Sequence, residues 1–162
     1  MIECYLGLGA NQQDPVRVLH MAKKILQTIP FTHIEDYSPI IQTPPFGVLG
    51  QPIFYNQVIQ ILTGLQAEVL LSEIQKIEKS IGRIKTLAWG PRKIDIDILI
   101  YGNKILKSET LTLPHPQIWQ RPFVTEQLQS FNRPIIHHFL QNKTSSTLLK
   151  HTILIPQQYR TL

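Results

Sequence analysis

The segment Lys93-Ile94-Asp95-Ile96-Asp97-Ile98-Leu99-Ile100 most constrains the fold, because hydrophobic residues alternate along it with acidic ones. Alternation with a period of two is typical of a β-strand with one buried face. We therefore expect the isoleucines at 94, 96, 98 and 100 to point into a core. The carboxylates of Asp95 and Asp97 should then project together from the opposite face, where two negative charges repel each other and require a nearby cation.

Two interpretations of this acidic pair remain open. Paired carboxylate oxygens suit Mg²⁺, which keeps several waters and takes other ligands from substrate phosphates. The pair could instead belong to a solvated strand face that forms salt bridges with Lys93 or Arg92.

The preceding loop, from Arg83 to Arg92, places three cations and an indole beside the acidic pair. Guanidinium groups bind phosphate through two hydrogen bonds, and cations neutralise the charge that develops during phosphoryl transfer. The alternative is an ordinary basic surface loop. The arrangement favours a phosphate-binding function near Asp95 and Asp97.

Periodicity elsewhere predicts an α+β chain. Strand-like alternation begins at Ile2, and helical spacing follows Asp14-Pro15 and ends at Pro30. Further elements are predicted in this order: a strand at about 32–41, a loop at 43–47, a strand at about 53–63, a helix at 67–81 and a strand at 93–101. This βαββαβ order indicates a ferredoxin-like core with an antiparallel sheet.

A hairpin at about 104–113 and a helix at about 122–131 should follow this core, whereas the pattern after Arg133 is too weak to assign elements. The length suits one domain spanning residues 1–162.

Composition limits the partners and the compartment. The formal charge is +5, and six of the 16 Lys and Arg residues fall between Lys76 and Lys93. This clustering favours an anionic partner, either nucleic acid or a polyphosphate. A single cysteine, no signal-like N-terminus and no apolar run of about 20 residues together predict a cytoplasmic protein that does not enter membranes. We also expect a monomer.

The segment from Arg83 to Ile98, with its core Trp89-Gly90-Pro91-Arg92 followed by the acidic pair, resembles the signature of the 6-hydroxymethyl-7,8-dihydropterin pyrophosphokinases, enzymes of the folate pathway. Other segments resemble that family in the same order along the chain: 7–11, 43–47 with 51–56, 75–78, and 113–116 with Arg121 and Phe123. The resemblance extends over roughly residues 2–131.

The resemblance implies transfer of diphosphate from ATP to the pterin hydroxymethyl group, with release of AMP. It implies two Mg²⁺ ions held by Asp95 and Asp97. The implied pterin-binding residues are Thr43, Pro44, Pro45, Phe46, Phe54, Asn56, Asp95 and Phe123. The implied ATP-binding residues are Gln75, Glu78, Lys85, Trp89, Arg92, Ile98, Thr112, His115 and Arg121. The implied catalytic residues are Arg83, Lys85, Arg92, Asp95 and Asp97.

Two alternatives stand beside this hypothesis. An RNA-binding module has the same element order and a basic charge, but its third strand should carry an aromatic, glycine-containing motif that Phe54 to Ile59 lacks. A catalytically weak or repurposed relative would bind nucleotide or pterin without efficient transfer. Departures from the family pattern, such as Ala10 for serine and Lys85 for arginine, support that second alternative.

Overall fold

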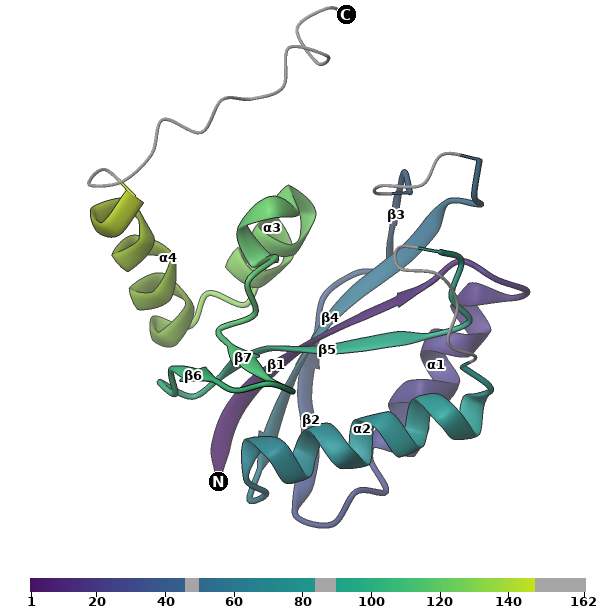
Figure 1. Ribbon diagram of the computed structural model, residues 1–162, viewed down its shortest axis with the longest axis horizontal. Helices are drawn as coiled ribbons and strands as arrows, with labels where there is room; N and C mark the ends of the chain where they lie inside the picture. Colours follow the sequence, from purple (N-terminus) through teal and green to yellow (C-terminus); the bar gives the residue numbers. More distant parts are fainter. Residues whose placement is uncertain (46–49, 84–89, 148–162) are drawn as a thin grey trace, which may run out of the picture. The chain divides into compact units, whose positions relative to one another are not determined.

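The computed structural model of the chain is shown in Figure 1 and describes residues 1–45, 50–83 and 90–147, with side chains described up to residue 141. The chain divides into two compact units, Met1–Phe131 and Asn132–Leu162. Every element discussed below lies in the first unit, except the helix α4 (Pro134–Thr147).

An antiparallel sheet with two helices on one face and a third helix over the other forms the first unit (Figure 1). Strands β2, β4, β1 and β5 are neighbours in that order, and β3 also pairs with β4. The strands span Ile2–Ala10 (β1), Thr32–Tyr37 (β2), Ile41–Thr43 (β3), Phe54–Thr63 (β4) and Asp95–Tyr101 (β5). Helices α1 (Pro15–Leu26) and α2 (Ala67–Ile81) pack against one face of this sheet. The predicted mixture of helices and antiparallel sheet is confirmed.

Local sequence explains where the two helices begin and end. The Asp14 side chain accepts a hydrogen bond from the backbone N–H of Arg17 at 3.2 Å, and Pro15 occupies the first helical turn of α1. The left-handed φ of 95° at Gly82 closes α2, as expected for a glycine after a helix. The start of α1 and both ends of α2 agree with the sequence prediction.

The end predicted for α1 is wrong. The helix stops at Leu26, and a tighter turn follows, in which the backbone N–H of Thr28 donates to the carbonyl of Ile25 at 2.9 Å. Ile29 is nevertheless buried. Ile29 lies after the helix but packs on the same core, so its apolar side chain continued the helical spacing of the sequence beyond the true end of α1.

The single strand predicted for 32–41 is two strands, β2 and β3, separated by Ser38-Pro39-Ile40. Pro39 cannot donate to a strand ladder. Two buried amides hold the bend, because Gln57 Nε2 donates to the carbonyl of Ser38 at 2.6 Å and Gln127 Nε2 donates to the carbonyl of Pro39 at 2.8 Å. The bend also moves Thr43, predicted to lie in a loop, to the last position of β3.

The alternation predicted for β5 holds through Ile98. Ile94, Ile96 and Ile98 lie in the core cluster shared with α1 and α2. A register shift against β1 follows, so Tyr101 joins that cluster while Ile100 is buried outside it. The expectation that Ile100 shares the core of the other three is therefore wrong. The strand also starts at 95 rather than at 93.

The rest of the chain adds short elements. Strands β6 (Leu106–Lys107) and β7 (Thr112–Leu113) pair with each other, and a 3-10 turn, η1 (Ile118–Gln120), precedes α3 (Pro122–Ser130). Helix α3 matches the prediction for 122–131, whereas α4 lies where the sequence assigned no element. In the part of the chain that the structure describes, no helix combines the length and apolarity needed to cross a bilayer.

The thiol of Cys4 is expected to be unreactive in the native protein. Cys4 is fully buried in β1, its Sγ donates to the carbonyl of Ile2 at 3.5 Å, and burial raises the pKa of the thiol to about 12. Because the thiolate is the reactive form, a disulfide reagent at pH 8 should label Cys4 only after unfolding. Rapid labelling of the native protein, timed against labelling in denaturant, would contradict this packing.

Candidate active site

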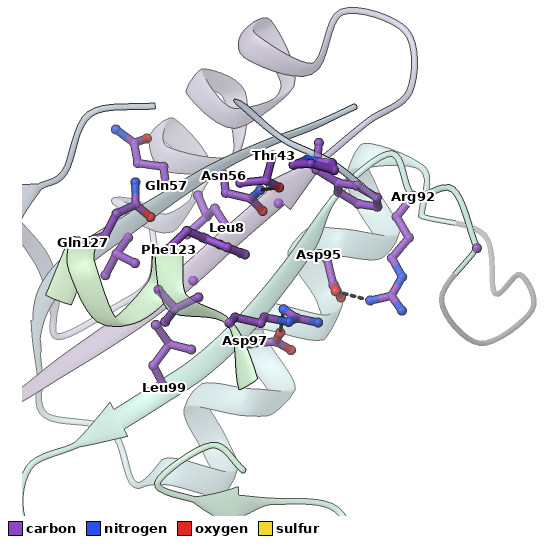
Figure 2. A pocket seen from close by; sticks show the side chains of 18 residues that line it. Leu8, Thr43, Asn56, Gln57, Arg92, Asp95, Asp97, Leu99, Phe123 and Gln127 are labelled. Atoms are coloured by element: carbon purple, nitrogen blue, oxygen red, sulfur yellow. Dashed lines mark hydrogen bonds and ion pairs between the residues drawn. The ribbon is translucent and has the colours of Figure 1, made fainter. Parts of the chain in front are cut away.

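A pocket lies on the sheet face that α1 and α2 leave uncovered, between that face and α3 (Figure 2). Its empty volume is about 720 Å³, open solvent included. The sequence-predicted site residues that line it are Thr43, Pro44, Phe54, Asn56, Arg92, Asp95, Asp97, Arg121 and Phe123.

Two glycines of β1 form the floor of the pocket. Gly9 pairs with Asn56 on one side and Asp95 on the other, and Gly7 pairs in the same way with Val58 and Asp97. A Cβ atom on Gly9 would lie 2.9 Å from Oδ1 of Asn56, closer than real Cβ contacts allow. The missing side chains therefore let β4 and β5 present their polar groups across one open surface.

Aromatic and amide groups occupy the β4 side of the pocket. Phe54 and Asn56 are two residues apart on β4 and share a face, and Phe123 reaches the same pocket from α3. Asn56 Nδ2 donates to Thr43 Oγ1 at 2.8 Å, which joins β3 to β4 beneath the pocket. The walls thus offer two aromatic rings and an oriented amide.

The acidic pair occupies the β5 side. Arg92 pairs with Asp95, as the dashed line in Figure 2 shows, and Arg83 Nη2 lies 2.8 Å from the other oxygen of Asp95. Asp97 has weaker partners, with His115 Nε2 at 4.0 Å and Arg121 Nη1 at 3.9 Å.

The balance of these charges differs between the two carboxylates. Burial raises the pKa of Asp97, and the like charge of Asp95 raises it further, against the opposing effects of His115, Arg121 and Arg92. The cations nearby therefore do not offset the combined effect of burial and of Asp95 on Asp97. An added cation between the two aspartates would do so.

Glu78, predicted to lie on the nucleotide side, is a buried link between α2 and β5. Its Oε1 accepts the backbone N–H of Ile96 at 2.7 Å and pairs with Arg83. Burial raises the pKa of Glu78, against the hydrogen bond from Arg83. For Arg83, burial lowers the pKa, but Glu78 and Asp95 outweigh it and the net direction is upward. Glu78 thus fixes both the backbone of β5 at Ile96, between the two aspartates, and the guanidinium of Arg83 beside them.

Asn11 is a contact centre for which the sequence suggested no separate role. It is buried, its Oδ1 accepts the backbone N–H of Arg92 at 2.8 Å, and its Nδ2 donates to the carbonyl of Pro52 at 3.1 Å. One side chain therefore connects the end of β1 to the segments that lead into Phe54 and Asp95. An asparagine directly after a strand was the available signal, but its partners lie 41 and 81 residues away.

Other predicted site residues lie outside the pocket lining. Gln75 is exposed on α2, Thr112 lies in β7, and Pro45 follows β3. Ile98 has its side chain in the core, so only its backbone could face a nucleotide. His115 borders the pocket through Asp97, and its Nδ1 accepts the backbone N–H of Gln117 at 3.3 Å, which leaves Nε2 toward Asp97. Phe46, Lys85 and Trp89 lie outside the described residues.

The donor set fits a divalent cation that shares its ligands with a substrate. Within residues 1–45, 50–83 and 90–147 no group of three or more His, Cys, Asp or Glu side chains could hold a metal ion. Two carboxylates on one strand face suit Mg²⁺ completed by phosphate oxygens and water. The raised pKa of Asp97 supports this fit, because a cation beside this carboxylate would favour its charged form.

A pocket with aromatic walls, an acidic pair and a cationic rim is typical of proteins that bind small molecules rather than macromolecules. The model of the family described as 7,8-dihydro-6-hydroxymethylpterin-pyrophosphokinase (HPPK) matches residues 5–133. The chain belongs to the HPPK family.

Similar proteins carry the corresponding names. The chain is 41% identical over 124 residues to the 2-amino-4-hydroxy-6-hydroxymethyldihydropteridine pyrophosphokinase of Haemophilus influenzae, covering 76% of this chain and 78% of that protein. The protein of the same name from Aquifex aeolicus is 36% identical over 137 residues, with 85% and 84% covered. The folic acid synthesis protein fol1 of Pneumocystis carinii is 37% identical over 134 residues, which are 82% of this chain but 18% of that longer protein.

A solved structure supports the fold. A chain described as "HPPK-DHPS in complex with substrates" superposes with a TM-score of 0.63 at 14% identity, covering 96% of this chain and 46% of that one. At this identity the similarity establishes the fold alone.

Proposed function

We propose that this chain transfers a diphosphate group from ATP to 6-hydroxymethyl-7,8-dihydropterin, giving AMP and the pterin diphosphate for folate biosynthesis. The observation that carries the proposal is the pocket that joins the rings of Phe54 and Phe123 to the pair Asp95 and Asp97 across the glycine floor. Membership of the HPPK family supports the same reaction and does not favour the RNA-binding module or the repurposed relative.

The pterin ring would lie between Phe54 and Phe123, since aromatic faces favour offset stacking with a flat ring. Thr43, Pro44 and Asn56 line the same pocket and would meet the polar edge of the ring. Pro45 and Phe46 stay predicted members of this site. In this position the hydroxymethyl group would point toward Asp95.

ATP would bind with its phosphates beside the acidic pair. Arg92 and Arg121 line the pocket, and Arg83 and His115 contact the aspartates from its border. The remaining predicted nucleotide contacts are Gln75, Glu78, Lys85, Trp89, Ile98 and Thr112. Asp95 and Asp97 would hold Mg²⁺, as two ions, which would supply positive charge to neutralise the phosphates.

In the reaction, the hydroxymethyl oxygen attacks the β-phosphorus of ATP and a new O–P bond forms. The bond between the β-phosphorus and the α,β-bridging oxygen breaks, AMP leaves, and the hydroxyl proton passes to solvent or to Asp95. The guanidinium groups position the phosphates in line and stabilise the charge on the transferring group. We assign no dedicated general base.

The strand order supports a finer description of the fold. We infer that the first unit is ferredoxin-like, because β1, β2 with β3, β4 and β5 alternate with α1 and α2 in the order of that fold. We also propose that the paired strands β6 and β7 form the hairpin expected at about 104–113. The single domain, the cytoplasmic location and the monomeric state stay predictions.

The test is product analysis with ATP, Mg²⁺ and 6-hydroxymethyl-7,8-dihydropterin. Equal amounts of AMP and pterin diphosphate are expected, with no AMP when the pterin is omitted. ADP as the nucleotide product would indicate ordinary kinase chemistry, and an absence of any pterin product would contradict the proposal.

A further inference from the structure

The pocket contains a buried amide oxygen without a hydrogen-bond partner among the described residues. Gln127 of α3 lines the pocket and is only 6% exposed. It lies one helical turn after Phe123, so both residues share a face of α3. Figure 2 shows Gln127 at the opposite end of the pocket from Arg92.

The orientation of this amide is determined by its other contact. Nε2 of Gln127 donates to the carbonyl oxygen of Pro39 at 2.8 Å. That oxygen can only accept hydrogen bonds, so a flipped amide would place two acceptors against each other. Oε1 therefore points away from Pro39, and it is buried with no partner.

The pocket residues near this oxygen do not donate to it. Val58, Leu99 and Val124 have side chains without N–H or O–H groups. Gln57, which lies beside Gln127 in Figure 2, directs its Nε2 to the carbonyl of Ser38 at 2.6 Å. A buried carbonyl oxygen in such surroundings is unfavourable, and a donor on a bound ligand would remove that cost.

We propose that Gln127 is a specificity-determining residue that accepts a hydrogen bond from an N–H group on the ring edge of the bound pterin. The inference rests on the proposed function. A ring stacked against Phe123 presents its edge, rather than its face, to a side chain one turn further along α3. Asn56 lies on β4, so the two amides would meet the ring from different elements.

The test is the variant Gln127→Met, which keeps the length of the side chain and removes both the strong acceptor and the donor to Pro39. Calorimetric titration with hydroxymethyl-dihydropterin, in Mg²⁺ and an α,β-methylene analogue of ATP, should show a Kd about tenfold weaker than that of the wild type. The Kd of the ATP analogue itself should stay unchanged. The variant Gln127→Glu should restore pterin binding at a pH low enough to protonate the new carboxyl, because the protonated group can donate to Pro39 and still present an oxygen to the pocket.

A matched control is Gln60→Met. Gln60 is 2% exposed, its Nε2 donates to Glu3, and its Oε1 also lacks a partner among the described residues, but it does not line the pocket. Gln60→Met should lower the thermal midpoint and leave the Kd of the pterin unchanged.

Unchanged pterin affinity in Gln127→Met would overturn the inference and assign the oxygen to a bound water or to structure alone. A failure of Gln127→Glu to restore affinity would also overturn it. If the wild type neither binds the pterin nor forms AMP, the proposed function fails instead, so the two failures are distinguishable.

Discussion

Replacement of Asp97 by asparagine is expected to reduce ATP-dependent formation of the pterin diphosphate by roughly 10³-fold or more, because a metal ligand supplies several kcal/mol of charge stabilisation in such reactions. Asparagine keeps the size of the side chain and one oxygen but removes the negative charge that we assign to Mg²⁺. The measurement is AMP release at saturating ATP over a range of Mg²⁺ concentrations.

The same substitution should raise the thermal midpoint of the metal-free protein by a few degrees at pH 7. Burial and the charge of Asp95 raise the pKa of Asp97 above its unfolded value. A carboxyl whose pKa is higher in the folded state than in the unfolded state is harder to ionise in the folded protein. At a pH above both values its ionisation therefore lowers the stability of the fold, and asparagine removes that cost. Below the unfolded pKa the difference between variant and wild type should disappear.

Asp36→Asn is the control for both measurements. Asp36 is exposed on β2, far along the sheet from β5, and its Oδ1 accepts the backbone N–H of Tyr37 at 2.8 Å, a bond that asparagine can keep. This variant should leave activity and the thermal midpoint near those of the wild type. Near-normal turnover of Asp97→Asn in Mg²⁺ would contradict the role assigned to the acidic pair.

Asn11→Ala is expected to lower kcat/KM by about 100-fold, because misplacement of binding groups by about 1 Å can have an effect of this size. The substitution removes the hydrogen-bond partner of the N–H of Arg92 and of the carbonyl of Pro52, with a cost to stability of about 1 kcal/mol for each of these partly buried bonds. Steady-state kinetics for both substrates, together with denaturant unfolding, would measure the two effects separately.

Asn11→Asp separates the two contacts of this side chain. Aspartate can still accept from Arg92 but cannot donate to Pro52. We expect it to raise the KM for the pterin more than the KM for ATP, since Pro52 leads into β4 and the pterin side of the pocket. Equal effects on both substrates, or none, would show that Asn11 does not couple these segments.

The spacing of apolar residues along the sequence correctly predicted the strands and helices that bury one regular face. The alternation from Ile94 to Ile98 and the helical stripe of α2 are properties of neighbouring residues, and both appear in the structure. The break between β2 and β3 was missed because amides from β4 and α3 hold it. Ile29 misled the prediction of α1 because a residue can join a core without belonging to the helix that precedes it.

The residues of the site likewise divide into those that the sequence predicted and those that only the structure reveals. The sequence predicted the acidic pair, the arginines and the aromatic residues, and the structure brings nine of the predicted residues to one pocket. The contacts of Asn11, Glu78 and Gln127 join residues that are far apart in the chain, so only the folded geometry reveals them. Periodicity and motifs identify reactive groups, but they do not show which buried amides and carboxylates position those groups.

The position of β1, which carries the glycine floor, also fixes the distance between the two sides of the pocket. Strand β1 lies between β4 and β5 for the whole length of the pocket, so the backbones that carry Asn56 and Asp95 are two strand spacings apart, about 9.5 Å. Backbone hydrogen bonds set that separation, and side-chain substitutions cannot adjust it. Any pair of substrates must therefore place the attacking hydroxyl and the ATP phosphates across this fixed distance. Pterin analogues that differ in the length of the arm carrying the hydroxyl should be discriminated more strongly than analogues that differ around the ring.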